Sequence, residues 1–427
     1  MKESFLHYIW ELQYFVKKDL LTNQQEQVEI LNPGTLNTDA GPDFLNAKIR
    51  IGEIEWIGNV EVHKQSSDWF MHHHQHDQSY SNVILHVVYK HDKEIYFPDG
   101  TIVPTIELQS RIAQDLILKY SKLVNSPERV PCSYRLPAMN NLIKLSAKEN
   151  ALLKRLQRKS AEVETLLKRN KNDWEETIYQ LLAKNFGFKV NSDTFLRLSK
   201  ALPYKILSRH RQNLFQLEAL LFGQSGLLDE GHEDQYPGSL MKEYEFLSHK
   251  YSLRDDKLEK FEWKFLRTRP ANFPSLRIAE FAAIINKNPS LFSSAIGLEN
   301  ARDIYSWFSI QTSAYWSKHY VFDKEVEEGT RTLGSASIEN IAINTIVPLL
   351  VCYSKEKNEE AYLEKAISIL ESLPAEDNKI THLLNRHGME ITSGFDSQAA
   401  IELYNNYCRK KNCLNCAIGN YIVKMPA

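Results

Sequence analysis

The sequence predicts an α+β protein, with a mixed-sheet α/β domain at residues 1–125 followed by a large all-helical domain at residues 140–427. Three observations predict this order. Apolar and polar residues alternate repeatedly up to about residue 108, as they do in half-buried strands. From about residue 140 onward, apolar residues recur at helical spacing and strand signals are almost absent. The chain has 427 residues, 43% of them hydrophobic, which is enough for two cores.

Composition limits the class of protein. The 52 basic and 54 acidic residues leave a net charge of −2, so the totals indicate neither a strongly acidic nor a strongly basic partner. Five cysteines in a chain of this length do not suggest a disulfide scaffold. The N-terminal residues contain no apolar core of signal-peptide length, and Asn344 and Pro348 interrupt the longest apolar run. We therefore expect a cytoplasmic protein that does not enter a membrane.

The first predicted elements are a helix and a short strand. Phe5, Leu6, Ile9 and Trp10 recur at helical spacing, which predicts an amphipathic helix from residue 3 to about residue 17. Residues 28–31 alternate and predict a strand, which the following Asn-Pro-Gly turn ends.

Residues 37–64 carry the clearest functional pattern. Gly41-Pro42 predicts a sharp turn, and Asp43 opens the next segment. Alternation over residues 47–63, with a turn at residues 52 and 53, predicts a hairpin or meander. Side chains two positions apart on a strand share a face, so Glu61 and His63 are expected to point the same way.

Asp43, Glu61 and His63 form a candidate metal site. Carboxylate oxygens suit magnesium or manganese, and such an ion activates water and neutralises charge on a phosphoryl group. The alternative is a solvated sheet face that happens to carry Glu and His. The spacing alone leaves both interpretations open.

Pro42-Asp43 followed by Glu61-Val62-His63-Lys64 resembles the PD-(D/E)xK nuclease-like superfamily. There an Asp starts one strand, Glu-x-Lys lies on the next, and a helix precedes the sheet. The resemblance implies that Asp43 and Glu61 act with bound Mg or Mn, and that Glu11 on the first helix lends a further acidic group. A solvent-facing Glu11 is the simpler interpretation. His63 occupies the Lys position, so either it replaces Lys as ligand or proton shuttle, or the site has lost its activity.

The whole chain also resembles a family of uncharacterised bacterial proteins that carry a domain of unknown function. This resemblance spans most of the chain and implies no activity. The matching segments are residues 37–44, 58–63, 68–69, 82–89, 185–188, 269–274 and 413–416.

A run of histidines, His72-His73-His74-Gln75-His76-Asp77, follows a predicted helix start at residues 66–69. Histidine-rich tracts bind metal ions. His73 with Asp77, or His72 with His76, has the i, i+4 spacing that brings two ligands together on a helix. A polar segment at the rim of the site is the alternative. A transition metal bound at His74 or His76 would indicate a hydrolase of small molecules.

Residues 83–89 are apolar on both faces and predict a central strand covered on both sides. His86 is the one polar residue inside this run, and a buried histidine needs a partner. It is either a satisfied core histidine or a group oriented toward Glu61 or His63. A turn at residues 97–100 and a return strand at residues 103–108 complete the predicted sheet.

The start of the helical region is locally basic. Residues 142–212 contain sixteen Lys and Arg against seven Asp and Glu, an excess of nine positive charges. Such an excess is typical of contact with a phosphate backbone, and a solvated helical face is the alternative. The candidates for nucleic-acid contact are Lys64, Lys154, Arg155, Arg158 and Lys159, with Arg267 and Arg269 from a loop fixed by two prolines.

Cys408, Cys413 and Cys416 lie close together near the C-terminus. The Cys-x2-Cys step lets two thiolates meet one ion across a tight turn. Cys132 is the candidate for a fourth ligand, whereas Cys352 lies in an apolar helix and is typical of a core residue. These cysteines hold either zinc or an iron–sulfur cluster, or they are unliganded thiols in a helical hairpin.

The leading hypothesis is a metal-dependent nuclease that acts on DNA or RNA through Asp43, Glu61 and His63. One alternative is a non-catalytic nucleic-acid-binding protein on a degenerate nuclease scaffold. The other is a metal-dependent hydrolase of small molecules.

Overall fold

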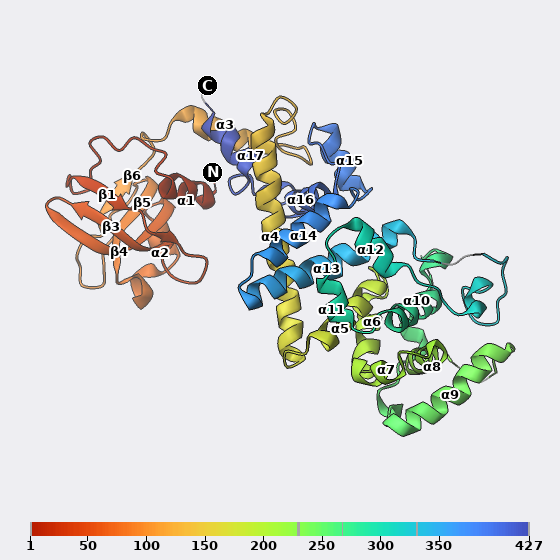
Figure 1. Cartoon of the computed structure of the whole chain (residues 1–427). Helices are drawn as coiled ribbons and strands as arrows, with labels where there is room; N and C mark the ends of the chain where they lie inside the picture. Colours follow the sequence, from red (N-terminus) through yellow and green to blue (C-terminus); the bar gives the residue numbers. More distant parts are fainter. Residues whose placement is uncertain (1, 229–230, 267, 330–331, 426–427) are drawn as a thin grey trace. The chain divides into compact units, whose positions relative to one another are not determined.

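A computed structural model describes residues 2–228, 231–266, 268–329 and 332–425 of the chain (Figure 1). The chain forms two compact units: Met1–Ala147 with Tyr404–Ala427, and Lys148–Leu403. The first unit carries a mixed sheet and the second is helical, which confirms the predicted α+β class. The division differs from the expected one because the residues after Leu403 return to the first unit.

The first unit combines a sheet with short helices. Helix α4 (Asn141–Arg169) begins in this unit and continues into the second. The other elements of the first unit are α1 (Glu3–Glu11), β1 (Val28–Asn32), β2 (Thr35–Leu36), β3 (Phe44–Ile51), β4 (Ile54–Gln65), α2 (Asp68–Met71), the 3-10 turns η1 (His74–His76) and η2 (Gln78–Tyr80), β5 (Val83–Lys90), β6 (Thr105–Glu107), α3 (Gln114–Val124) and α17 (Ala417–Lys424).

The sheet has the strand order β1-β3-β4-β5-β6, and β2 pairs with β3. Strands β3 and β4 form an antiparallel hairpin, whereas β5 runs parallel to both β4 and β6. The segment that contains α2 therefore crosses over from β4 to β5. The first six residues of β5 are buried, as its apolar sequence predicts for a central strand.

Helix α1 ends at Glu11, earlier than the expected end near residue 17. The reason is a change of backbone conformation: Gln13 adopts the left-handed region with φ of 52°. The amide of Gln13 then donates to the carbonyl of Trp10 instead of continuing the helical pattern. Apolar spacing continued through Phe15, which is buried beyond the end of the helix.

Two glycines place the residues of the hairpin. Gly41 has a φ of 106°, which an L side chain rarely adopts, and it makes the turn that delivers Asp43 to the start of β3. Gly58 lies on β4 where β5 begins alongside. A Cβ added at Gly58 would lie 2.4 Å from Ile84 Cγ2 and 2.6 Å from the carbonyl oxygen of Asn82.

We expect Gly58→Ala to lower the free energy of unfolding by about 1–3 kcal/mol, because the added methyl group overpacks the contact between β4 and β5. Gly238→Ala is the control, since no atom lies within 4 Å of its added Cβ in α9 (Gln235–Tyr251), and alanine favours a helix by up to about 1 kcal/mol. Calorimetric melting of both variants measures the difference. A wild-type melting temperature for Gly58→Ala would contradict the close approach.

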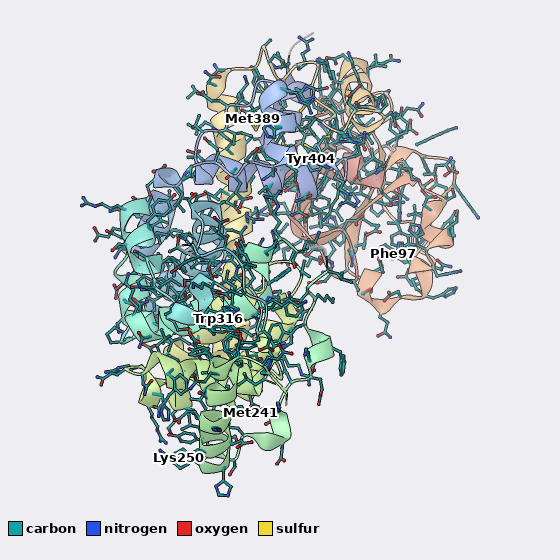
Figure 2. All side chains as sticks on the ribbon, turned by 90° about the vertical axis from the view of Figure 1, so that its right-hand side faces the viewer. Phe97, Met241, Lys250, Trp316, Met389 and Tyr404 are labelled. Carbon is teal, nitrogen blue, oxygen red and sulfur yellow. The ribbon has the colours of Figure 1, made fainter. Side chains whose placement is uncertain are left out.

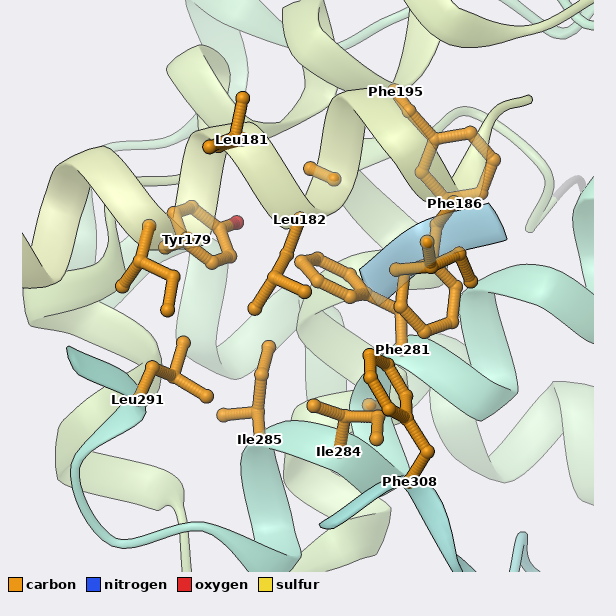
Figure 3. Packing of buried hydrophobic residues seen from close by; sticks show 14 of the residues in the cluster. Tyr179, Leu181, Leu182, Phe186, Phe195, Phe281, Ile284, Ile285, Leu291 and Phe308 are labelled. Atoms are coloured by element: carbon orange, nitrogen blue, oxygen red, sulfur yellow. The ribbon is translucent and has the colours of Figure 1, made fainter. Parts of the chain in front are cut away.

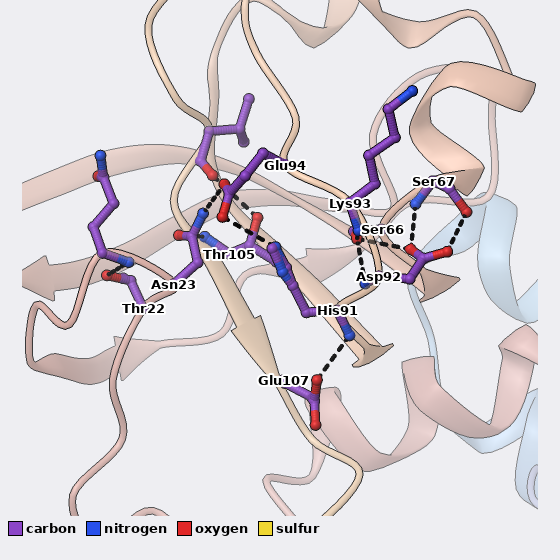
Figure 4. A network of polar contacts seen from close by, with 12 residues as sticks. Thr22, Asn23, Ser66, Ser67, His91, Asp92, Lys93, Glu94, Thr105 and Glu107 are labelled. Carbon is purple, nitrogen blue, oxygen red and sulfur yellow. Dashed lines mark hydrogen bonds and ion pairs between the residues drawn. The ribbon is translucent and has the colours of Figure 1, made fainter.

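A polar network fixes the turn from β4 into α2 (Figure 4). The hydroxyl of Ser66 and the amide of Ser67 both donate to Asp92 Oδ1 at 3.0 Å. The hydroxyl of Ser67 donates to Asp92 Oδ2, and the amide of Asp92 donates back to the Ser66 hydroxyl. Nearby, Trp69 of α2 is buried against Tyr80 and Phe97, the second of which is labelled in Figure 2. The start of the histidine-rich segment is therefore held in place.

The second unit consists of helices around one hydrophobic core. Phe281 lies at its centre, with ring centroids 5.5 Å from Tyr179, 5.2 Å from Phe186 and 6.5 Å from Phe195 (Figure 3). Its helices after α4 are α5 (Trp174–Phe186), α6 (Ser192–Ala201), α7 (Tyr204–His210), α8 (Leu214–Gln224), α9, α10 (Pro274–Lys287), α11 (Leu291–Ile296), α12 (Ala301–Phe308), α13 (Ser335–Lys357), α14 (Ala361–Ser372), α15 (Lys379–Arg386) and α16 (Gly394–Glu402).

Helix α13 is the one helix in the described part of the chain that has the length and composition to cross a membrane. Inside the protein, 61% of its most apolar window is buried. Core helices meet the same criterion, so this single helix is weak support for a membrane span.

Candidate metal site on strand β4

The hairpin brings Asp43 and Glu61 together. Phe44 pairs with Val60 across β3 and β4, so Asp43 lies beside Glu61. The amide of Asp43 donates to Glu61 Oε2 at 3.0 Å, and the amide of Val62 donates to Asp43 Oδ2 at 3.0 Å. The two carboxylates, which are far apart in the sequence, therefore meet at the edge where β3 begins.

Two histidines lie beside the other oxygen of Glu61, and a third contacts one of them. Glu61 Oε1 lies 3.4 Å from His63 Nε2 and 3.2 Å from His74 Nε2. His63 Nε2 lies 3.0 Å from His72 Nδ1. Ligands about 2.0–2.1 Å from a tetrahedral zinc ion are about 3.3 Å from one another. The ligand atoms of His63, His72 and His74 all lie within 4.8 Å of one another, which is close enough for one transition-metal ion, and Glu61 Oε1 lies beside two of these histidines.

The histidine-rich segment reaches this point by a route that the sequence did not suggest. The expected i, i+4 pairs, His73 with Asp77 and His72 with His76, do not form on a helix, because α2 ends at Met71. His73 takes a left-handed conformation with φ of 61°, which starts a new 3-10 turn at His74. This bend brings His72 and His74 to one place, and His76 remains exposed.

Burial determines the charge of the cluster. It raises the pKa of Glu61 to about 8, and the negative charge of Asp43 adds to this effect. Burial, followed by the neighbouring His86, lowers the pKa of His63 to about 2, and burial lowers the pKa of His74 as well. Neutral imidazoles are the form that binds metal ions. His74 Nε2 is buried without a hydrogen-bond partner, so one ligand atom is left for an ion.

His86 orients His63 from the neighbouring strand. His86 on β5 pairs with Glu61 on β4, and its Nε2 lies 2.8 Å from His63 Nδ1. Burial lowers the pKa of His86 to about 3, so its ring is neutral and Nε2 can accept a hydrogen bond. His63 then donates from Nδ1 and presents the lone pair of Nε2 to the cluster, as metal-binding histidines commonly do.

Helix α1 contributes His7 rather than Glu11. His7 Nε2 lies 3.3 Å from Asp43 Oδ2. Burial alone would lower the pKa of His7, but the adjacent Asp43 outweighs it and the net shift is upward. Glu11 is exposed. His7 was missed in the sequence, although it lies four residues before Glu11 and so on the same helical face.

A pocket of about 320 Å³ lies against α1 in the first unit. His7, Tyr8 and Glu11 line it from the helix, and residues 410–415 form another part of its wall. A smaller pocket of about 120 Å³ is lined by His74 together with Trp69 and Tyr80. His74 of the cluster therefore lines the smaller pocket, and His7, which contacts Asp43, lines the larger one.

Most of the proposed basic contacts on α4 are paired with acids. Arg158 Nη2 lies 2.8 Å from Glu402 Oε2, Arg155 also approaches Glu402, and Lys159 approaches Glu162. Lys64 and Lys154 are exposed. Arg269 is exposed and lines a pocket of about 340 Å³ in the second unit, and Arg267 lies outside the described residues.

Four of the five cysteines belong to the first unit. Cys132, Cys413 and Cys416 are buried, and Cys408 is partly buried. Burial, followed by the neighbouring thiols, raises the pKa of Cys132 to about 12 and that of Cys413 to about 11. Among the described residues, the one group of three or more ligand atoms within 4.8 Å of one another is His63, His72 and His74. The four thiols are near enough to influence one another's pKa, and the described cysteines do not form a second group of this kind.

A family model described as a protein of unknown function (DUF2851) matches residues 3–379. No curated protein and no solved structure matches the chain.

Proposed function

The chain belongs to the DUF2851 family of proteins of unknown function, and we propose that it is a metal-dependent nuclease that hydrolyses phosphodiester bonds of DNA or RNA. The observation that carries this proposal is that His63, His72 and His74 bring three ligand atoms within 4.8 Å of one another, with Glu61 Oε1 next to His63 and His74, as the ligands of one tetrahedral ion would be. Three imidazoles favour a transition metal such as zinc over magnesium. When bound, such an ion lowers the pKa of a coordinated water and neutralises phosphoryl charge.

The arrangement of the elements supports a nuclease of the PD-(D/E)xK type. A helix precedes the sheet, Asp43 starts one strand, Glu61 and His63 lie on the next, and β5 returns parallel to β4. His63 stands where that pattern has Lys, and in this protein it belongs to the ligand cluster. Lys64 points away from the cluster and is exposed, which leaves it free to meet a phosphate backbone.

Each remaining residue has a separate role in the proposed site. His86 is a positioning residue, because it holds the ring of His63 through Nδ1. Asp43 and His7 form a pair beside Glu61, and Asp43 raises the pKa of His7 against the effect of burial. A histidine whose pKa is raised by a neighbouring carboxylate is suited to exchange a proton with water or with a leaving group.

We expect the purified protein to retain a transition metal at this cluster and to hydrolyse DNA or RNA, and we expect His74→Ala and Glu61→Gln to lose the metal of the cluster and the hydrolysis. His76→Ala is the matched control, because His76 belongs to the same histidine run but is exposed and lies outside the cluster. Elemental analysis of untagged protein and a nuclease assay measure the two properties. Hydrolysis that persists in both cluster variants would contradict the proposal. Salt-dependent binding without hydrolysis would indicate the non-catalytic alternative instead.

A second candidate is a metal-dependent hydrolase of small phosphate esters. The ion pairs of Arg155, Arg158 and Lys159 favour it, because they reduce the positive charge that α4 offers to a nucleic acid. In the same assay, cleavage of phosphate-ester model substrates with no cleavage of DNA or RNA would support this candidate.

We also propose that Cys132, Cys408, Cys413 and Cys416 hold a second metal centre. Four thiolates on one zinc ion stand about 3.8 Å apart, with Zn–S bonds of about 2.3 Å. An iron–sulfur cluster, whose cysteines surround several metal ions, is the other centre that four cysteines can hold. The elemental analysis of His74→Ala separates the two centres, because that variant should keep the metal of the cysteines.

A further inference from the structure

We propose that the pocket of about 320 Å³ beside α1 binds the terminal phosphate monoester of a nucleotide-sized substrate. This inference rests on the proposed hydrolase function and names the substrate class of that same site. Ligand pockets for small molecules commonly have volumes of about 300–1,000 Å³. The pocket is therefore suited to a single nucleotide unit, either a free nucleotide or the end of a strand, and is too small for the side of a continuous duplex.

The pocket is lined by more positive than negative charge. Its ionised side chains are Lys2, Lys410 and Lys411, against Glu11. Lys410 Nζ donates to the amide oxygen of Asn406 at 2.8 Å, and Lys411 Nζ donates to the backbone carbonyl of Ser126. Both partners are uncharged, so these two ammonium groups keep their charge available for an anion.

Neutral donors add to the charge. The N-terminus of α1 lies at the pocket through Lys2 and Ser4, and no side chain caps it, so its first amides can meet an anion. Asn412 and Asn415 also line the pocket, and Asn415 Nδ2 donates to Asn412 Oδ1 at 2.8 Å. Tyr8 also lines the pocket, is 6% exposed, and has a hydroxyl without a hydrogen-bond partner. A buried hydroxyl without a partner is unfavourable unless a ligand or water supplies one.

The pocket is connected to the metal site through His7. His7 lines the pocket and lies 3.3 Å from Asp43 Oδ2, and Asp43 accepts the amide of Val62, next to Glu61 on β4. A substrate that placed a terminal phosphate among the lysines would therefore lie next to His7, which contacts Asp43 of the metal site. The pocket would select the end of the substrate, and the cluster would act on the bond that follows.

The test measures binding to the full-length protein by isothermal titration calorimetry, with adenosine monophosphate, adenosine and inorganic phosphate as probes. We expect adenosine monophosphate to bind, adenosine to bind at least tenfold more weakly, and the double variant Lys2→Ala/Lys410→Ala to weaken the monophosphate about tenfold. Lys18→Ala is the matched control, since Lys18 is an exposed lysine of the same unit that does not line the pocket. Equal binding of monophosphate and adenosine, or unchanged binding in the double variant, would overturn the inference.

Two further measurements distinguish a free nucleotide from a strand end, and the pocket proposal from the metal-site proposal. A 5′-phosphorylated single-stranded oligonucleotide, compared with its 5′-hydroxyl form, shows whether a strand end also enters the pocket. Glu61→Gln should lose hydrolysis but keep phosphate binding, because Glu61 does not line the pocket. If Glu61→Gln loses hydrolysis but still binds phosphate, the result tests the metal site alone. If the lysine double variant binds the monophosphate as well as the wild type does, the result contradicts the pocket proposal alone.

Discussion

The affinity of the protein for a divalent transition metal should rise about tenfold for each pH unit between pH 6 and pH 8. Before an ion binds, the pKa of Glu61 is about 8, because burial and the charge of Asp43 both disfavour its carboxylate. Metal binding requires the ionised form, so below pH 8 one proton must leave Glu61 for each ion bound. Burial lowers the pKa of His63 to about 2 and lowers the pKa of His74 as well, which favours the neutral, metal-binding form of both rings before an ion binds.

Competition with a chromophoric zinc chelator at several pH values measures this slope, and calorimetry in buffers of different ionisation enthalpy counts the protons released. Glu61→Gln is the decisive variant, because its amide does not titrate: we expect weaker binding with little pH dependence. For Asp43→Asn, metal affinity should still rise with pH, but the rise should end at a lower pH. Removing the charge of Asp43 removes one cause of the raised pKa of Glu61. Affinity that is constant from pH 6 to pH 8 in the wild type would contradict the assignment of Glu61 as a ligand.

The alternation of apolar and polar residues predicts the hairpin. The complete set of metal ligands depends on contacts between distant residues, which this alternation does not predict. Alternation fixes which residues share a face of a strand, so Glu61 and His63 were expected together, and the turn at Gly41-Pro42 predicted the place of Asp43. His72 and His74 meet the cluster because His73 adopts a left-handed conformation, a local choice that asparagine or histidine makes in some turns and not in others. His7 lies beside Asp43 because α1 packs there, and the residue pattern of β4 does not predict that packing.

The basic stretch and the domain boundary show a second limit. A sequence count of charges does not show which of them have partners, and acids that follow much later in the chain, such as Glu402 and Asp396, neutralise Arg158 and Lys148. For the cysteines, the structure adds a partner to the predicted group. The spacing of Cys408, Cys413 and Cys416 predicted that they lie together, and the return of the C-terminal segment to the first unit brings them near Cys132.

The second large effect concerns a buried ion pair in the second unit. Arg277 and Glu280 are 3% and 1% exposed, and Arg277 Nη1 lies 2.7 Å from Glu280 Oε2. Arg277 Nη2 also donates to Asn272 and to the hydroxyl of Ser337 on α13. The guanidinium lies over the ring of Phe188 at 4.8 Å. One side chain therefore connects α10 with α13, with the loop before α10 and with the end of α5.

We expect Arg277→Met to lower the free energy of unfolding of this unit by about 3–5 kcal/mol, because Glu280 would be left buried without its partner. The double variant Arg277→Met/Glu280→Met should recover much of that loss, since replacing both members of a buried pair with apolar residues is often neutral. Arg197→Met is the control, because Arg197 is paired with Glu262 at the surface, where such pairs contribute about 0–1 kcal/mol. Urea unfolding followed by tryptophan fluorescence measures all three.

The double variant also separates charge from hydrogen bonding. If the penalty of Arg277→Met comes from the isolated carboxylate, it disappears when Glu280 is replaced as well. If the double variant is as unstable as the single one, the stabilisation comes instead from the bonds that Arg277 makes to Asn272 and Ser337, which both variants lose. In that case Asn272→Ala alone should reproduce part of the effect, by about 1–2 kcal/mol, because it removes one charge-assisted hydrogen bond and leaves the ion pair intact.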